Sequence, residues 1–375
     1  MHLLFCTRVL FALLSIAAID ASAEVRPLKI EEVGRGESIA YDMNAAGQAA
    51  VVLKDANGLQ HAAFWENGQL FRLDTLGGIE SESKGINDHG EIIGSAQKAN
   101  GSWAAFVYSR AKGMRELGTL GGFSTNGTGL NNRGEAVGFA DTPDGQWHAF
   151  LSQPGKPMQD LGTLGGKISY ASGINNQGQV VGTAMDRNGF RHAFFYDAKR
   201  GMVDLGTLGG RFSSAAAIND DGWVVGTSEM KDRSWHAFLF DGKEMKDLGA
   251  LIGRGDSYAT GINNAGHVVG TVKLNGERLG ERRLAFVWRD QKMNLHPSGK
   301  ALYVTNAINN QGQVVGAHYD RGFHAATMPS NMTPFVDRDG EKILSFNLLM
   351  PLLAGALVVF RKRLTGLVFS RHSSV

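Results

Sequence analysis

Histidine is the residue type in this sequence whose recurrence most directly suggests chemistry. A neutral imidazole can bind a metal ion or act as a general base, so histidines that converge on one axis could form a metal ring or a catalytic centre. The histidine belongs to a repeated motif, in which two copies carry Ala104 and Leu284 in its place. The other five copies have His61, His148, His192, His236 and His324.

An aspartate follows four of these histidines, 11 to 13 residues further along: Asp74, Asp160, Asp204 and Asp247. Equivalent residues of a repeated unit converge only if they face a shared channel, and we expect the histidine strand to lie away from the axis. A His–Asp hydrogen bond within one unit would satisfy both polar groups. We therefore predict a structural role for the five histidines, with no metal site and no catalytic residue.

Two further recurring segments resemble ligand loops in composition only. The segment Asn219-Asp220-Asp221-Gly222 has part of an acidic calcium loop, but the first ligand position is Ala217 and most copies have amides in place of acids. The Leu-Gly-Thr-Leu-Gly-Gly segments lack the following helix and the Lys-Ser/Thr pair of a phosphate loop. We predict that the asparagine segments are turns. The Leu-Gly-Thr-Leu residues are expected to end the fourth strand of each unit, closed by Gly-Gly, and to bind no phosphate. We predict no cofactor.

Residues that depart from the repeat mark the candidate binding site, because repetition itself reports folding. The sixth unit is the longest, and it carries the charged residues Arg254, Asp256, Arg282 and Arg283. Three tryptophans, Trp103, Trp147 and Trp235, each precede the histidine position by one residue. Aromatic rings beside Arg and Asp suit the binding of a sugar or peptide. For the tryptophans themselves, however, we favour packing between neighbouring units over ligand binding.

Composition excludes several classes of protein. The formal net charge of the 375 residues is only +2, so there is no electrostatic case for nucleic-acid binding. Hydrophobic residues make up 43 %, which is enough for a large core and argues against disorder. Cys6 is the only cysteine and lies in the predicted leader, so the mature chain has no disulfide, no thiolate nucleophile and no Cys-ligated zinc.

Both ends of the chain are predicted to be targeting segments. Residues 1–23 have one cation, an apolar run and the small-x-small pattern Ala21-Ser22-Ala23, which together indicate a signal peptide. The alternative is a buried helix.

At the other end, residues 343–360 are an apolar run long enough to cross a bilayer, and Arg361-Lys362-Arg363 follows directly. We predict a linker at 338–342, a transmembrane helix at 343–360 and a basic cytoplasmic tail at 361–375. A buried terminal helix is the alternative for this run.

The elements that must position these side chains are seven copies of one unit. Its anchor asparagine recurs at intervals of 43 to 46 residues: Asn44, Asn87, Asn131, Asn175, Asn219, Asn263 and Asn309. Turn residues divide each copy into four short segments rich in β-branched and aromatic residues. A four-strand unit of about 44 residues is the size of a propeller blade. We predict an all-β fold, a seven-bladed β-propeller over residues 24–337.

The ends of the repeat array favour a closed ring. Without a gap, the segment Ile30-Glu31-Glu32-Val33-Gly34 aligns with fourth-strand residues Leu161 to Gly165, yet no first three strands precede it. The last repeat has three clear strands and only a degraded fourth at Met332 to Asp337. We predict that the chain from Pro27 to Val33 completes the last blade. An open β-solenoid is the alternative.

The motifs His148-Ala149-Phe150, His192-Ala193-Phe194 and His236-Ala237-Phe238 recur in register with Leu-Gly-Thr-Leu-Gly-Gly and Ile-Asn-Asn-x-Gly. Over residues 27–326 the chain thereby resembles the bacterial extracellular HAF-repeat family. The resemblance implies an exported bacterial protein and no particular activity. The tail resembles bacterial surface-sorting tails in layout, but it lacks the Pro-Glu-Pro signature of one such class.

These features predict an exported, non-catalytic β-propeller that binds a protein or glycan at the bacterial cell envelope or surface. The expected location is the periplasm, the cell surface or the extracellular space, with the C-terminal span as a membrane anchor. We expect a monomer and no nucleic-acid partner. The alternative function is a propeller-type hydrolase or lyase acting on extracellular polysaccharide, which would place acids and arginines of several blades around the central entrance.

Overall fold

The structure, a computed structural model, describes residues 26–27, 37–252, 255–276, 280–297, 302–319 and 323–329. The predicted signal peptide (1–23), linker (338–342), transmembrane helix (343–360) and basic tail (361–375) lie outside the described residues. Within the described part of the chain, no helix is both long enough and apolar enough to span a membrane.

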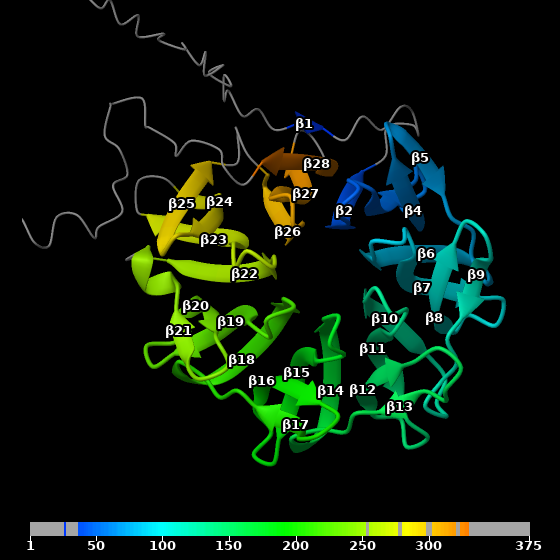
Figure 1. Ribbon diagram of the computed structural model, residues 1–375, viewed down its shortest axis with the longest axis horizontal. Helices are drawn as coiled ribbons and strands as arrows, with labels where there is room; N and C mark the ends of the chain where they lie inside the picture. Colours follow the sequence, from blue (N-terminus) through cyan, green and yellow to red (C-terminus); the bar gives the residue numbers. More distant parts are fainter. Residues whose placement is uncertain are drawn as a thin grey trace, which may run out of the picture.

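Seven four-stranded antiparallel sheets surround a central channel, as Figure 1 shows, and the predicted seven-bladed β-propeller is confirmed. Each blade runs outward from the channel as a simple meander. The strands of blades 1 to 3 are β2 (Ser38–Met43), β3 (Ala49–Lys54), β4 (Gln60–Glu66) and β5 (Gln69–Arg72); β6 (Gly77–Ile86), β7 (Ile92–Lys98), β8 (Trp103–Ser109) and β9 (Gly113–Glu116); β10 (Thr125–Leu130), β11 (Ala136–Asp141), β12 (Trp147–Ser152) and β13 (Gln159–Asp160).

Blades 4 to 7 repeat this order, and one short 3-10 helix, η1 (Gly249–Leu251), follows blade 5. Their strands are β14 (Gly165–Ile174), β15 (Val180–Asp186), β16 (Arg191–Asp197) and β17 (Gly201–Asp204); β18 (Gly209–Ile218), β19 (Val224–Met230), β20 (Trp235–Phe240) and β21 (Met245–Asp247); β22 (Asp256–Ile262), β23 (Val268–Gly276), β24 (Gly280–Arg289) and β25 (Lys292–Pro297); β26 (Val304–Ile308), β27 (Gln313–Tyr319), β28 (Phe323–Pro329) and β1 (Arg26–Pro27).

The N-terminal strand β1 supplies the outer strand of blade 7, as the ends of the repeat array predicted. It pairs antiparallel with β28, with Pro27 opposite Ala326. In blade 3 the residue in Pro27's place is Asp160, opposite Phe150. The gapless alignment gave this place to Lys29, so the predicted register was wrong by two residues, and residues 28–33 of the predicted strand lie outside the described residues. The reason is that the connection from β1 to β2 is longer than its counterparts.

Ring closure is also made by hydrogen bonds between blade 7 and blade 1. The Ala325 backbone N–H donates to Ser38 Oγ at 3.0 Å, and Asn306 Nδ2 donates to the Ala40 carbonyl at 2.8 Å. An open solenoid would leave these groups apart, so that alternative is excluded.

Serine or threonine near the start of each inner strand stitches neighbouring blades together. Its side-chain oxygen accepts the backbone N–H of the alanine that follows the histidine position in the preceding blade, over 2.8–3.1 Å. Among the described residues, six of the seven blade junctions have this bond, and the oxygens belong to Ser38, Ser81, Thr125, Ser169, Ser213 and Ser257. Both groups are buried, so each bond satisfies a donor that water cannot reach.

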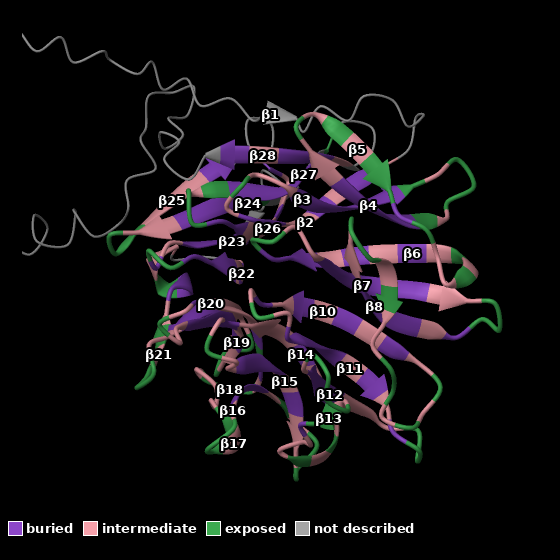
Figure 2. Cartoon of the chain, turned by 45° about the vertical axis from the view of Figure 1, so that its right-hand side comes forward, coloured by how far each residue is buried: buried purple, intermediate pink, exposed green. Residues whose placement is uncertain are grey.

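The core consists of apolar layers between blades, and Figure 2 shows buried residues along the strands with exposed residues concentrated in the outer loops. The third strand contributes a fully buried phenylalanine in five blades: Phe106, Phe150, Phe194, Phe238 and Phe286. Each lies opposite a glycine of the second strand, such as Gly182 opposite Phe194. A Cβ at Gly182 would lie 2.0 Å from the Tyr170 carbonyl oxygen, so only glycine allows the inner strand this close.

Candidate functional site: the central ring and the hairpin face

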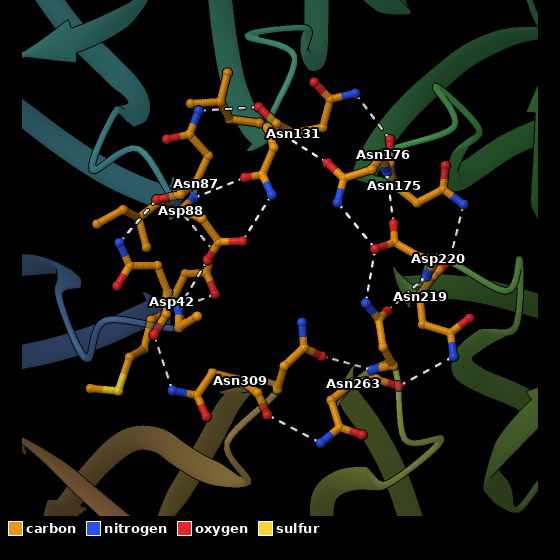
Figure 3. A pocket seen from close by; sticks show the side chains of 18 of the residues that line it. Asp42, Asn87, Asp88, Asn131, Asn175, Asn176, Asn219, Asp220, Asn263 and Asn309 are labelled. Atoms are coloured by element: carbon orange, nitrogen blue, oxygen red, sulfur yellow. Dashed lines mark hydrogen bonds between the residues drawn. The ribbon is translucent and has the colours of Figure 1, made fainter.

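The seven anchor asparagines form a closed ring of hydrogen bonds around the channel (Figure 3). Each side-chain Nδ2 donates to the backbone carbonyl of the next anchor asparagine over 2.9–3.2 Å, and Asn309 donates to Asn44 to complete the circle. The anchors are 3–5 % exposed. This ring therefore joins all seven blades at the end of the channel where the inner strands finish.

The same amides also close their own turns. Asn175 Oδ1 accepts the backbone N–H groups of Gln177 and Gln179 at 3.1 and 3.0 Å, and its Nδ2 donates to Gln179 Oε1 at 2.6 Å. The prediction that the asparagine segments are turns is confirmed. Every polar atom of the amide has a partner, which is why asparagine and not aspartate fits the position. The prediction that the fourth strand of blade 4 runs to Leu208 is wrong, because β17 ends at Asp204 and residues 205–208 connect it to β18.

A second ring, one residue further along, is open at one place. The residue after each anchor donates its backbone N–H to the side-chain Oδ1 of the equivalent residue in the next blade, over 2.9–3.0 Å. Six such bonds run from Ala45 through Asp88 to Asn310. Ala45 has no side-chain acceptor, so the second ring ends between blade 7 and blade 1.

These rings line a cavity of about 190 Å³, into which blade 1 brings one side chain that the other blades lack. Two residues before the anchor, blades 2 to 7 have only glycine or alanine, whereas blade 1 has Asp42. Asp42 accepts the backbone N–H groups of Ile86 at 3.0 Å and Met43 at 2.8 Å. Burial, with a smaller contribution from the nearby charge of Asp88, outweighs these two backbone hydrogen bonds and raises the pKa of Asp42 to about 6. Sequence reasoning missed Asp42, although its departure from a small-residue position is visible in the alignment of repeats.

Three of the predicted His–Asp bonds are present. His148 and His192 each bond through Nδ1 to Asp160 and Asp204 at 2.8 Å, and His236 bonds to Asp247 at 2.9 Å. The Asp160 and Asp204 side chains are 43 % and 40 % exposed, so these acids are not buried as expected. Since each pair belongs to one blade, these three histidines do not meet. No cluster of three metal-binding side chains occurs in the described ranges.

His61 has other partners than the predicted Asp74. Its Nε2 bonds to Asp55 Oδ2 at 2.9 Å, and Arg72 donates to its Nδ1 at 2.8 Å. Asp55 lies in the β3–β4 hairpin and Arg72 on β5, so the imidazole is held from both sides. The bond to His61 lowers the pKa of Asp55. His324, the fifth histidine, lies partly buried on β28.

The tryptophans and Arg283 share one position. Because consecutive turns of a meander alternate between its two ends, the hairpins between second and third strands lie on the face opposite the asparagine turns. We call this the hairpin face: residues 55–59, 99–102, 142–146, 187–190 and 231–234, with the first residues of the inner and third strands. On the third strand of blades 2 to 6, the residue directly before the histidine position is Trp103, Trp147, Arg191, Trp235 and Arg283.

Aromatic contacts surround this position. Trp147 packs edge-on against Phe139 with ring centroids 5.2 Å apart, and Phe139 meets Tyr170 of blade 4 at 5.0 Å. Trp235 stacks on Phe212 at 6.5 Å. All of these rings are only partly buried. Trp147 and Trp235 therefore pack on aromatic rings of their own blades and also keep some surface exposed.

The charged candidates of blade 6 do not form one cluster. Asp256 Oδ1 accepts the backbone N–H of Trp235 at 2.9 Å, so it joins blade 6 to blade 5. The Arg283 guanidinium lies 5.6 Å above the ring of Tyr303, which in turn lies 5.7 Å from that of Tyr319. Arg254 is outside the described residues, and the structure describes only the backbone of Arg282, on β24.

The hairpin face has an apolar sector and a cationic sector. Eight residues before the anchor, blades 2 and 3 carry Ile79 and Phe123, which are 61 % and 65 % exposed. Blades 4 and 5 carry Lys167 and Arg211 at the same position, both exposed. The sequence analysis did not identify these four residues. They could have been found because they differ between blades at one fixed position, eight residues before the anchor asparagine.

Solved structures share the fold at low sequence identity, whereas no protein-family model and no curated protein sequence matches the chain. The β-propeller domain of the trilobed protease from Pyrococcus furiosus aligns with a TM-score of 0.52 and 13 % identity, covering 80 % of this chain and 99 % of that one. A puromycin-hydrolysing peptidase from Mycobacterium tuberculosis gives 0.54 and 11 % over 78 % of this chain and half of the peptidase.

TolB from Acinetobacter baumannii gives a TM-score of 0.44 and 14 % identity over 80 % of this chain and 65 % of that one. The chain thus spans about two thirds of this TolB and half of the peptidase. At these identities the likeness shows the fold alone, and that fold is the β-propeller.

Proposed function

We propose that this protein is an exported, non-catalytic β-propeller that binds a glycan through its hairpin face at the bacterial cell envelope or surface. The observation that carries the proposal is the single position at which Trp103, Trp147 and Trp235 alternate with Arg191 and Arg283. A sugar ring offers C–H groups to an aromatic face and oxygens to a guanidinium, and this face presents both.

The histidines and asparagines that could act as catalytic groups are bonded to other residues of the protein instead. His148, His192 and His236 each bond to an aspartate of their own blade, and the anchor asparagines bond from blade to blade. A general base must reach the same substrate as its acid or nucleophile, and these histidines stand in separate blades. This arrangement favours binding over turnover.

The proposed cellular location of the protein is based on sequence features. The predicted signal peptide at 1–23 and the resemblance to the HAF-repeat family both support export from a bacterial cell. The predicted span at 343–360, followed by three cations, supports attachment to the inner membrane with the propeller outside it.

A glycan-array screen combined with a turnover assay on the same saccharides tests the function. We expect saturable binding that Trp147→Ala weakens and Phe71→Ala does not, because Phe71 is an exposed aromatic on the outer strand β5. Melting curves of both variants check that folding is retained. Release of reducing ends would contradict the proposal and favour the alternative, a polysaccharide hydrolase or lyase.

A further inference from the structure

Six exposed cations gather on the hairpin face of blades 4 and 5. They come from the first residues of two inner strands, from the two hairpins and from the start of one third strand: Lys167, Arg187, Arg191, Arg211, Lys231 and Arg233. In sequence they are spread over 67 residues, from 167 to 233. The fold brings them to one side of the molecule.

Close contacts show that the cations are neighbours. A Cβ at Gly165 would lie 2.6 Å from Cγ of Arg187, so that arginine lies across the strand that leads to Lys167. Lys231 lies in the same way across Gly209, 3.2 Å from such a Cβ, on the strand that leads to Arg211. The two blades therefore present the same pair of cations side by side.

Aromatic rings lie between the two pairs. The Arg211 guanidinium is 5.6 Å above the ring of Phe190, which bridges the junction to Phe212 at 5.8 Å. Phe212 continues to Trp235, whose ring is within 19° of parallel. Arg191 directly follows Phe190, and Arg233 stands two residues before Trp235. The junction of blades 4 and 5 is thus an aromatic strip with cations along it.

The cations of this cluster have no acidic partner within the described residues. The lysine and arginine ion pairs there involve Lys54, Lys84, Lys98, Arg110, Arg133, Arg200 and Lys246 instead. The neighbouring acids are turned to the backbone: Asp186 accepts N–H groups of its hairpin at 2.8–2.9 Å, and Glu229 accepts that of Arg211 at 2.7 Å. The cations remain available for an external anion.

We infer that the junction of blades 4 and 5 binds an acidic polysaccharide, one whose sugar rings carry carboxylates. The inference rests on the proposed glycan-binding function and names its substrate class. Sugar rings pack on the strip Phe190–Phe212–Trp235 while Lys167 and Arg211 meet their carboxylates. Arginine suits this task because its planar fork matches a carboxylate with two hydrogen bonds.

Calorimetric titration of the full chain with polygalacturonate oligomers tests the inference. The matched ligand is the fully methyl-esterified oligomer, which keeps the sugar rings and loses the charge. The matched variants are Lys167→Glu/Arg211→Glu on the cluster and Lys112→Glu/Lys199→Glu, two exposed lysines in third-to-fourth-strand loops on the opposite face. We expect binding of the acidic oligomer, at least about tenfold weaker binding by the first double variant, and unchanged binding by the second.

Three results would overturn the inference. Equal affinity for the methyl-esterified oligomer would leave glycan binding intact and refute the acidic class. Equal affinity for single-stranded DNA of the same charge would indicate a general polyanion surface. If the protein binds neither oligomer but binds neutral glycans on the array, the acidic class alone is refuted. If it also binds no glycan on the array, the proposed function is refuted as well.

Discussion

At the scale of single residues, the anchor asparagines and the histidines show how far the repeat alone could be interpreted. The Asn-x-x-Gly turns and three His–Asp pairs were predictable because their partners lie within one unit. The bond from Asn175 to Asn219 was not, because it depends on the ring bringing residues 44 positions apart into contact. His61 shows the reverse case. Arg72 stands where blades 3 to 5 have the partner aspartate, so His61 bonds to Arg72 and to Asp55 of its own hairpin.

Removing one anchor amide should destabilise the whole ring. Asn175→Ala leaves the buried Asn219 carbonyl without its donor and the turn N–H groups of Gln177 and Gln179 without an acceptor. We expect a loss of about 2–4 kcal/mol of unfolding free energy, measured by denaturant titration. Asn188→Ala, at an exposed hairpin, is the control and should change stability by less than about 0.5 kcal/mol. Equal losses would mean that the ring contributes nothing specific.

Asp42 should make stability depend on pH in a defined direction. Its pKa in the folded protein, about 6, exceeds the ordinary 3.8, so the folded state holds the proton more tightly. Stability therefore falls as pH rises from about 4 to about 6 and is constant above that range. Asp42→Asn should remove this fall and be more stable than wild type at pH 7.5 by up to about 3 kcal/mol. If the difference in unfolding free energy between Asp42→Asn and wild type is the same at pH 4 and pH 7.5, this role of Asp42 is refuted.

At the scale of strands, the repeated glycine of the second strand sets how closely the inner strand can approach. Its pairing with a buried phenylalanine recurs in blades 2 to 6, while blade 1 has Val51 opposite Ala63. The strand order was predictable from turn residues and β-branched runs. The close approach was not, because a glycine in a strand does not reveal which backbone lies above it.

Gly182→Ala tests that approach. The added methyl would lie 2.0 Å from the Tyr170 carbonyl oxygen, so β14 must move, and we expect a loss of about 3 kcal/mol or more in a denaturant titration. Gly189→Ala is the matched change. Its Cβ meets nothing within 4 Å, so only its positive φ opposes the substitution, at about 1 kcal/mol. A smaller loss at Gly182 than at Gly189 would refute the packing account.

At the scale of the whole molecule, the number of blades and the closure by β1 followed from the sequence because seven equal units and an orphan strand leave few arrangements. The grouping of cations and aromatic rings on the hairpin face could not be predicted from the sequence. Lys167 and Arg211 look like ordinary surface cations until the ring places them beside the aromatic strip. The sequence pointed to the tryptophan position, which the proposed function also uses, and to the charged residues of blade 6, where Asp256 accepts the backbone N–H of Trp235.

Deleting residues 24–34 should open the ring. Blade 7 then loses the strand paired with β28 and exposes a sheet edge, so we expect the melting temperature to fall by several degrees. Deletion of the last eleven residues, 365–375, removes the same length and should leave the melting temperature unchanged. A fall of the same size in both proteins would show that β1 does not fasten the ring.

The central claim is that the hairpin face binds the glycan, and hydrogen exchange tests it most directly. Exchange is measured with and without the saccharide that the array shows to be bound most tightly. We expect slower exchange of backbone amides at residues 187–191, 209–212 and 231–235, and no change at the asparagine turns. Protection confined to the turns around Asn44, Asn131 and Asn219 would place the ligand in the central cavity and contradict the account.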